Sequence, residues 1–322
     1  MSSQRVNYFL RSIERMVLSV IVNDPYLVGK SKPEVDEEIV NADGLTLSYK
    51  EWRERGDYYD KPRAGILIAH GYGERIEKYV HLAERLTASG YRVSGADFRG
   101  MGRSGGTRYS IKSFDQYSMD LQTSLCRLKR DLRKDAPVFI YGHSMGALAG
   151  LHFLAGDLGS PVSGVILSAP LFEFGDKIPF WQIIAGRAAT VFLPEFKIKT
   201  ASNSNRLTRC MIENEKMAND ELRASYITLE WFFAAQRASR SVQMAFSANS
   251  APTLWLLPGE DKVVSASATE ALFTKFAEAK EDEMTRFEGM LHELHVELKE
   301  DRERVFERVV NWLNARCNRI SV

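Results

Sequence analysis

The feature that most constrains this chain is a short apolar run, residues 138–141, that enters the pentapeptide Gly-His-Ser-Met-Gly at residues 142–146. The residues that follow, beginning with Ala147, favour a helix. A strand that turns at once into a helix holds Ser144 on a sharp, strained turn, and side chains at positions 142 and 146 would crowd it. The pattern predicts a strand, a tight turn and a helix, with the hydroxyl of Ser144 standing clear of the backbone.

Strand and helix patterns alternate along most of the chain. A hairpin is predicted from residues 38–40 and 45–52, which surround an Asp-Gly turn. Further strands are predicted at residues 66–69, 91–96, 138–141, 162–167 and 253–257, and helices at 83–89, 121–132 and 299–316. Such alternation predicts an α/β protein whose mostly parallel central sheet is covered by helices on both faces.

The alternation fails between residues 172 and 250. That stretch is helical in pattern and rich in large apolar side chains, and no strand is evident in it. We interpret residues 172–250 as a helical cap inserted into an α/β core made of residues 36–171 and 251–322.

Composition excludes several classes of protein. Hydrophobic residues make up 44% and charged residues 26%, as in ordinary soluble proteins. The formal net charge is +1, so no field of one sign is available to attract nucleic acid. Three widely spaced cysteines indicate neither a zinc site nor a disulfide framework, which favours reduced thiols in the cytoplasm. The apolar residues 16–22 are too few to cross a bilayer.

The first 35 residues predict an amphipathic helix and a linker. One stripe of residues 5–22 collects eight apolar side chains: Val6, Phe9, Leu10, Ile13, Met16, Val17, Val20 and Ile21. We expect this stripe to pack on its own domain or on a second copy in a homodimer. The alternative is a helix that lies on a membrane surface and gives the protein peripheral membrane contact.

A serine nucleophile needs a base and an acid that orients the base. In proteins with this motif, the acid and then the histidine follow the serine along the chain. Only His292 and His295, of six histidines, lie far enough downstream, so the base is one of these two. Asp261 and its rival Glu260 follow a predicted strand, where a carboxylate can hold an imidazole in the correct tautomer.

The two candidate histidines form an H-x-x-H pattern, which also suggests a metal pair. The pattern differs from H-E-x-x-H, and no third ligand is evident in the sequence. We therefore predict no metal and no other cofactor.

The predicted strand at 66–69 runs into His-Gly-Tyr-Gly-Glu at residues 70–74. Where the nucleophile sits on such a turn, one oxyanion amide comes from this loop and another from the residue after the nucleophile. The N–H groups of Tyr72 and Met145 are thus predicted to form the oxyanion hole. The glycines of residues 97–105, after the next strand, suit a tight loop beside the site.

Taken together, these segments resemble the monoacylglycerol lipase and lysophospholipase family, which is grouped with the serine aminopeptidase-like hydrolases. The blocks H-G-x-G-E, D-x-R-G-x-G-x-S, G-H-S-M-G, the aspartate block and G-x-x-H-x-x-H follow the family's order over residues 66–297. The resemblance implies an α/β-hydrolase fold and a catalytic triad of Ser144, Asp261 and His292. It makes His295 a pocket residue.

The resemblance also implies that Glu74 and a basic residue four places on, here Lys78, lie near the polar head group of the substrate. Three positions depart from the family pattern. Lys78 replaces the usual arginine and loses its planar fork, which puts a glycerol preference in doubt. Met101 replaces a histidine and affects loop packing, and Ala147 replaces a glycine.

The apolar cap suits an acyl chain, with Phe174 and Trp181 as candidate substrate-binding residues. The function that the resemblance implies is cleavage of the carboxylic ester of a monoacyl lipid, a monoacylglycerol or lysophospholipid, through an acyl-enzyme that releases a fatty acid. Alternatives on the same scaffold are an aminopeptidase-like peptidase, a thioesterase or an acyltransferase. A peptidase would use carboxylates of the cap, for which the sequence offers Asp176, Glu195, Glu213 and Glu215. A complete triad argues against a binding protein without turnover.

Overall fold

The computed structural model describes residues 35–53, 61–156, 162–176, 180–190, 192–199, 204–245, 251–276 and 281–320. By its contacts the chain divides into two units, Met1–Lys32 and Pro33–Val322, and the description concerns the second. The predicted N-terminal helix, with its expected contacts to a second copy or a membrane, lies outside the described residues.

Eight of the ten described strands form a central sheet, in the order β1-β2-β4-β3-β5-β6-β9-β10. Only the pairs β1–β2 and β2–β4 are antiparallel, and every other neighbouring pair is parallel. The strands are β1 (Val35–Val40), β2 (Thr46–Trp52), β3 (Gly65–Ala69), β4 (Arg92–Ala96), β5 (Val138–His143), β6 (Gly164–Ser168), β9 (Thr253–Pro258) and β10 (Glu283–Phe287). The prediction of a mostly parallel sheet is confirmed.

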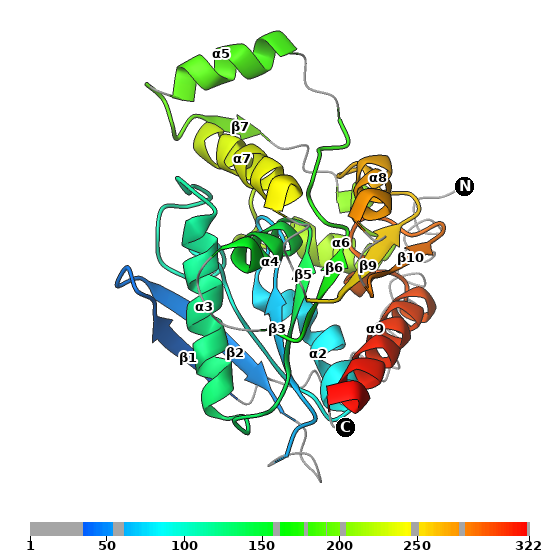
Figure 1. Cartoon of the computed structure of the whole chain (residues 1–322). Coiled ribbons are helices and arrows are strands. Elements are labelled where there is room, and N and C mark those ends of the chain that lie inside the picture. The colour runs from blue at the N-terminus through cyan, green and yellow to red at the C-terminus, as the bar shows by residue number, and fades with distance from the viewer. Residues whose placement is uncertain are drawn as a thin grey trace, which may run out of the picture. The chain divides into compact units, whose positions relative to one another are not determined.

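Helices cover both faces of this sheet (Figure 1). On one face, α3 (Asp115–Arg130) and α4 (Met145–Ala155) bury Leu125 and Leu148 against the strands. On the other face, α2 (Val80–Thr87) and α9 (Lys299–Ile320) bury a second set of apolar side chains, among them Leu86, Val309 and Trp312. The central strands β3, β5, β6 and β9 are largely apolar, as burial on both faces requires.

Two edge features show how local sequence sets the sheet. The β1–β2 hairpin turns at Gly44, whose φ of 75° favours glycine, and Asn41 Oδ1 accepts the amides of Asp43 and Leu45. At the opposite edge, β10 was not predicted from the sequence. Its residues are mostly polar and exposed because only one neighbour, β9, pairs with it.

Six described elements are inserted between β6 and β9, and we call them the cap segment. They are α5 (Phe180–Thr190), β7 (Lys197–Lys199), η2 (Ser204–Arg206), α6 (Met211–Ala218), β8 (Tyr226–Thr228) and α7 (Leu229–Ala245). The stretch is largely helical, as expected, but β7 and β8 pair as a small antiparallel sheet that the sequence pattern did not reveal. The exact limits of the cap, residues 172 and 250, stay a prediction. Among the described residues, no helix is long and apolar enough to cross a membrane.

Candidate active site

Ser144 occupies the predicted sharp turn between β5 and α4. Its backbone has φ 52° and ψ −114°, a left-handed conformation that is costly for any residue with a Cβ. Backbone hydrogen bonds hold it on both sides: its N–H donates to the carbonyl of Ser168 at 2.9 Å, and its carbonyl accepts the N–H of Leu171 at 3.2 Å. The strain is therefore maintained by the strand and loop that surround the turn.

The two motif glycines allow this turn to pack closely. A Cβ at Gly142 would lie 2.5 Å from the Cα of Ala147. A Cβ at Gly146 would lie 2.0 Å from the carbonyl oxygen of Ala69 at the end of β3. The start of α4, which includes Met145, consequently lies against the loop that follows β3, which carries Tyr72. This closeness is what a shared oxyanion hole would require.

Asp261 and His292 are brought together by loops that follow neighbouring strands, β9 and β10. His292 Nδ1 lies 2.8 Å from Asp261 Oδ2, and both side chains are buried. The other carboxylate oxygen of Asp261 accepts the amides of Val263 at 2.8 Å and Val264 at 3.0 Å. The rival acid, Glu260, is exposed, so the geometry favours Asp261.

The surroundings of this pair favour the ionised form of both Asp261 and His292. Burial opposes ionisation of Asp261, but the positive charge and hydrogen bond of His292, with the two backbone amides, lower the carboxyl pKa. Burial also disfavours the imidazolium of His292, yet the carboxylate of Asp261 outweighs it and raises the pKa of His292. The ring of His143 lies 4.8 Å from the ring of His292 and brings the end of β5 to the histidine loop.

The loop from β3 to η1 (Ile76–Tyr79) is fixed by several side chains. The Phe98 amide donates to His70 Nε2 at 2.8 Å, so His70 Nδ1–H donates to the carbonyl of Gly71 at 2.8 Å. The hydroxyl of Tyr72 contacts the carbonyl of Tyr226 at 3.0 Å, which links this loop to the cap segment. The loop therefore holds the Tyr72 amide in a set position.

Met101, one of the departures from the family pattern, contacts the same loop. The N–H of Gly73 lies 3.3 Å from Met101 Sδ, and the methionine side chain is completely buried. This position affects the packing of the loop, as the sequence comparison implied.

The predicted head-group residues lie in a buried ionic cluster. Lys78 Nζ lies 2.6 Å from Glu74 Oε1 and 2.6 Å from Glu293 Oε2. The second oxygen of Glu74 accepts the amide of Gly71 at 2.8 Å and the hydroxyl of Tyr79 at 2.6 Å. Every charged atom of Glu74 and Lys78 thus has a protein partner at close range.

The cluster also sets its own protonation. Burial favours the neutral form of Glu74, but the charge of Lys78 outweighs it and holds the pKa well below its usual value. For Glu293, burial and the adjacent Glu74 carboxylate prevail over Lys78 and raise the pKa to about 7. The two carboxyl groups share one lysine, and burial makes Glu293 the less readily ionised of the pair.

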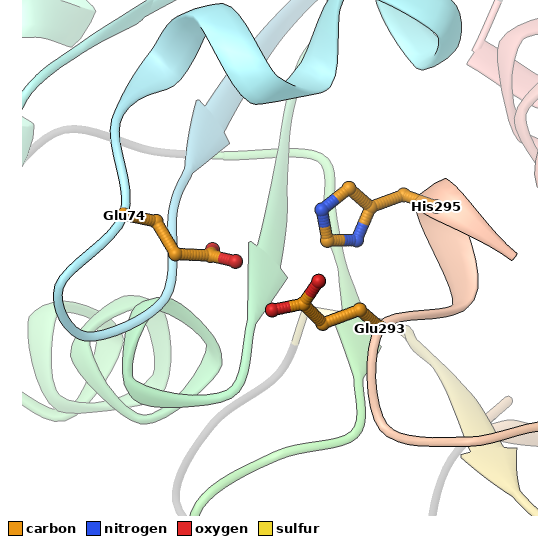
Figure 2. A group of neighbouring side chains, drawn as sticks. All are labelled: Glu74, Glu293 and His295. Carbon is orange, nitrogen blue, oxygen red and sulfur yellow. The ribbon is translucent and has the colours of Figure 1, made fainter. Parts of the chain in front are cut away.

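His295 lies beside these carboxyl groups (Figure 2). Its ring stacks on Tyr79, with centroids 4.2 Å apart and planes 8° apart, and burial lowers its pKa to about 3. Donor atoms of Glu74, Glu293 and His295 lie within 4.8 Å of one another, a spacing that suits a metal. The ammonium of Lys78, however, already contacts both carboxylates and supplies the positive charge that they require.

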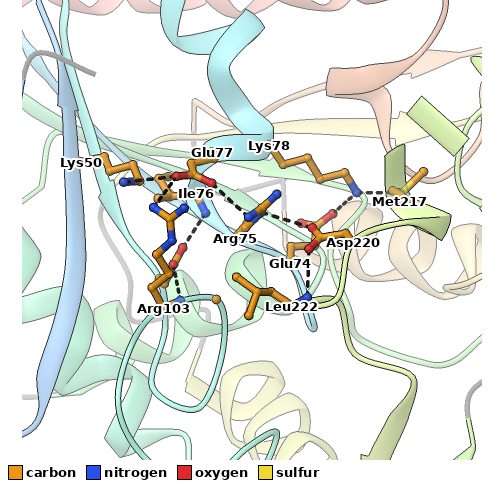
Figure 3. A network of polar contacts seen from close by, with 12 residues as sticks. Lys50, Glu74, Arg75, Ile76, Glu77, Lys78, Arg103, Met217, Asp220 and Leu222 are labelled. Carbon is orange, nitrogen blue, oxygen red and sulfur yellow. Dashed lines mark hydrogen bonds and ion pairs between the residues drawn. The ribbon is translucent and has the colours of Figure 1, made fainter. Parts of the chain in front are cut away.

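Further polar contacts of Arg75 and Glu77 support the same loop and η1 (Figure 3). Glu77 lies 3.3 Å from Lys50 of β2 and 3.0 Å from Arg103. Arg75 lies 3.2 Å from Asp220, which follows α6 in the cap segment. The loop is therefore tied to the sheet and to the cap.

Of the two aromatic candidates for substrate binding, Phe174 lies at a groove and the side chain of Trp181 lies outside the described residues. The groove has a volume of about 520 Å³ and runs between α7 and α8 (Ala266–Phe276). Its lining combines apolar and polar side chains. The apolar ones are Leu171, Phe172, Phe174, Ala235, Ala268, Ala271 and Leu272, and the polar ones are Glu173, Gln236, Ser239, Arg240 and Gln243. The backbone of one groove residue contacts the serine turn, because the Leu171 amide donates to the carbonyl of Ser144 at 3.2 Å.

Comparison with known proteins assigns the family. Residues 60–299 match the family model described as "Serine aminopeptidase, S33". The chain belongs to this family of α/β-hydrolases. The predicted fold is confirmed, and this α/β-hydrolase is a serine hydrolase, as the sequence blocks indicated.

The relatives of this α/β-hydrolase include lipid-cleaving enzymes. Phospholipase YtpA of Bacillus subtilis is 28% identical over 77% of this chain and 94% of its own length. Monoglyceride lipase of Homo sapiens is 27% identical over 86% of this chain and 90% of its own. An uncharacterized abhydrolase domain-containing protein of Dictyostelium discoideum is 25% identical over 86% of this chain, which spans only 29% of that relative.

Among solved structures, a soluble variant of monoglyceride lipase from Saccharomyces cerevisiae matches this α/β-hydrolase with a TM-score of 0.77. The sequences are 21% identical, and the match covers 91% of this chain and 98% of the other. At that identity the likeness concerns the fold.

Sequence reasoning missed one charged member of the site in this α/β-hydrolase, Glu293. A signal was present, because Glu293 directly follows His292 among residues that the structure buries, such as Met290, Leu291 and Leu294. A charged residue in such a run needs a buried partner, and only the fold shows that the partner is Lys78.

Proposed function

We propose that this α/β-hydrolase cleaves the carboxylic ester of a lipid with one acyl chain, a monoacylglycerol or a lysophospholipid. The proposal rests on a candidate serine nucleophile with its histidine–aspartate pair and on a nearby groove between α7 and α8. The strained Ser144 turn and the buried His292–Asp261 pair lie at the end of the sheet, and a groove lined in part by aromatic side chains includes Leu171, whose amide contacts the carbonyl of Ser144.

In the proposed reaction, Ser144 Oγ attacks the ester carbonyl and His292 Nε2 takes its proton. Asp261 holds the Nδ1–H of His292 and stabilises the imidazolium that forms. The amides of Tyr72 and Met145 bind the oxyanion. His292 then gives the proton to the departing alcohol, and a water molecule repeats the sequence on the acyl-enzyme to release the fatty acid.

The groove between α7 and α8 suits the acyl chain. Phe174 stacks on Phe232 with ring centroids 5.3 Å apart, and Phe172 stacks on Trp255 at 5.6 Å, so the aromatic walls are held in place. Each buried methylene contributes about 0.8 kcal/mol, so a long chain supplies much of the substrate affinity. The names of the bacterial and human relatives support a lipid substrate.

The contacts of the cap segment disfavour a peptidase. Its carboxylates would have to face a free amino terminus, but Asp176 is paired with Arg206 at 3.0 Å and Glu213 contacts Lys216. Glu195 and Glu215 are exposed. None of the four is a buried carboxylate that awaits a substrate amine.

A panel of substrates tests the proposal. Monoacylglycerols and lysophosphatidylcholines of increasing acyl length should be cleaved with kcat/KM rising about 200-fold over four added methylenes, at about 0.8 kcal/mol each. Aminoacyl anilides and acyl thioesters serve as comparison substrates, and alcohol acceptors detect acyl transfer. A preference for aminoacyl substrates, or no dependence on acyl length, would contradict the proposal.

The proposal extends to the exposed face of the cap segment, which we expect to contact the lipid surface that holds the substrate. Phe192 is 84% exposed and Leu193 is 56% exposed, and the same segment carries the exposed residues Lys197 and Lys199 together with one acidic residue, Glu195. Exposed apolar side chains with basic neighbours are typical of surfaces that rest on anionic lipid.

Serine at positions 192 and 193 should lower hydrolysis of monoacylglycerol held in anionic vesicles about 10-fold, since two large apolar contacts are lost. Hydrolysis of a soluble short-chain ester should stay unchanged. Val40→Ser, at an exposed position on the edge strand β1, is the matched control. Equal loss on vesicles and on the soluble ester would show that the cap face has no part in lipid contact.

A further inference from the structure

Two loops that carry proposed catalytic groups are joined by a short chain of buried polar contacts. One loop follows β10 and carries His292, with Glu293 next to it. Glu293 Oε2 lies 2.6 Å from Lys78 Nζ, and Lys78 Nζ lies 2.6 Å from Glu74 Oε1. Glu74 Oε2 in turn accepts the amide of Gly71, the residue before Tyr72, at 2.8 Å.

This chain of contacts is shielded from water. The exposed fractions of the side chains are 4% for Glu293, 13% for Lys78 and 8% for Glu74. Buried ionic groups of this kind are costly to separate, because removal of one partner leaves an uncompensated charge. The three side chains therefore restrain the distance between the two loops more firmly than an exposed ion pair would.

We propose that Glu293 is a positioning residue that, through the ammonium shared with Glu74, holds the loop of the base His292 in register with the loop of Tyr72. The inference rests on the proposed function, in which His292 and the Tyr72 amide act on the same ester. A displacement of about 1 Å between such groups costs about 100-fold in rate.

The position of Glu293 gives it a second effect, on the charge of the base. Its carboxyl group contacts Lys78 and lies within 4.8 Å of donor atoms of Glu74 and His295, and its charge acts on Tyr79 and His292. Burial lowers the pKa of His292, and the carboxylate of Asp261 and then the charge of Glu293 raise it. Loss of this charge should lower the pH at which the base becomes active.

The test compares Glu293→Leu with Glu293→Gln on a soluble ester across roughly pH 5 to 9. Glu293→Leu should lower kcat about 10- to 100-fold and change KM less than about 3-fold, because the lost register affects the transition state. Glu293→Gln keeps an oxygen that accepts from Lys78 and should recover most of kcat. Both variants should shift the acid limb of kcat/KM to lower pH.

A matched control uses another buried, ion-paired glutamate. Glu51 of β2 is fully buried and contacts Arg53 and Arg92. Glu51→Gln should lower the melting temperature without moving the acid limb, and activity at permissive temperature should stay within about 2-fold.

The inference would be overturned if Glu293→Leu had an unchanged kcat and an unmoved acid limb. It would also be overturned if the loss of activity in Glu293→Leu were explained by its lower melting temperature alone, as expected for Glu51→Gln. If Glu293→Leu does not fold, the acid limb of Glu293→Gln decides. Ser144→Ala separates the two levels: an active Ser144→Ala refutes the proposed function, whereas an inactive one beside normal Glu293 variants refutes only the role of Glu293.

Discussion

Ser144→Ala is expected to lower ester hydrolysis by at least about 10⁴-fold, because the acyl-enzyme can no longer form. The fold should be retained. The backbone at position 144 keeps its strained φ of 52° through hydrogen bonds of the main chain, which do not involve the hydroxyl. Steady-state kcat on a soluble ester and labelling by a fluorophosphonate, which reports an activated serine, measure the loss.

A second serine controls for the loss of a buried hydroxyl. Ser124 in α3 donates to the carbonyl of Asp120 at 2.9 Å, and Ser124→Ala removes one such bond outside the site. That variant should keep normal labelling. Ester turnover by Ser144→Ala at the level of Ser124→Ala would mean that another group is the nucleophile.

The core of the fold and the proposed triad could be predicted because their signals are local. Glycines at positions 142 and 146 are needed for the turn at Ser144, and the contacts that a Cβ would make at each show why. The order of serine, acid and histidine along the chain limited the base to two candidates. The structure then separates them, because His292 contacts Asp261 and His295 stacks on Tyr79.

The rest depends on contacts between distant segments. Strands β7 and β8 have three residues each, too few for an alternating pattern to show. Strand β10 is polar because it lies at an edge. Glu293 gains its place from Lys78, which belongs to a different loop, so its sequence neighbours could not reveal the pair.

The replacement of arginine by Lys78 illustrates the same limit. Toward a substrate head group, a lysine in place of arginine lacks the planar fork that binds two oxygens at once. In the structure the lysine ammonium, a single point of charge, contacts Glu74 and Glu293 at 2.6 Å each. Lys78 and Glu293 therefore belong to one buried ion cluster, in which the lysine ammonium binds the carboxylates of both Glu74 and Glu293.

The two histidines of the H-x-x-H pattern should differ sharply when replaced. His292→Ala should lose nearly as much activity as Ser144→Ala, because the members of a triad act as a unit. His295→Ala should change KM or substrate preference and lower kcat less than about 10-fold. His295 is buried against Tyr79, and its ring faces the Glu74–Lys78–Glu293 cluster.

The pH dependence of kcat/KM gives an independent test of the same assignment. The base works only when His292 is neutral, so activity should rise with pH through the pKa of His292. Asp261 raises that pKa above the ordinary histidine value, so the acid limb should have its midpoint above about 6.5. Asp261→Asn should lower kcat strongly and move the midpoint to lower pH, since the carboxylate that favours the imidazolium is gone.

His295 should leave this acid limb in place. Burial lowers its pKa to about 3, so His295 is neutral across the range in which the limb is measured. His295→Ala should therefore retain a limb with its midpoint above about 6.5, while residual activity of His292→Ala should show none. The reverse pattern, a limb lost with His295 and kept without His292, would exchange their roles. In that case His295 would be the base, and its carboxylate neighbours would be Glu74 and Glu293 instead of Asp261.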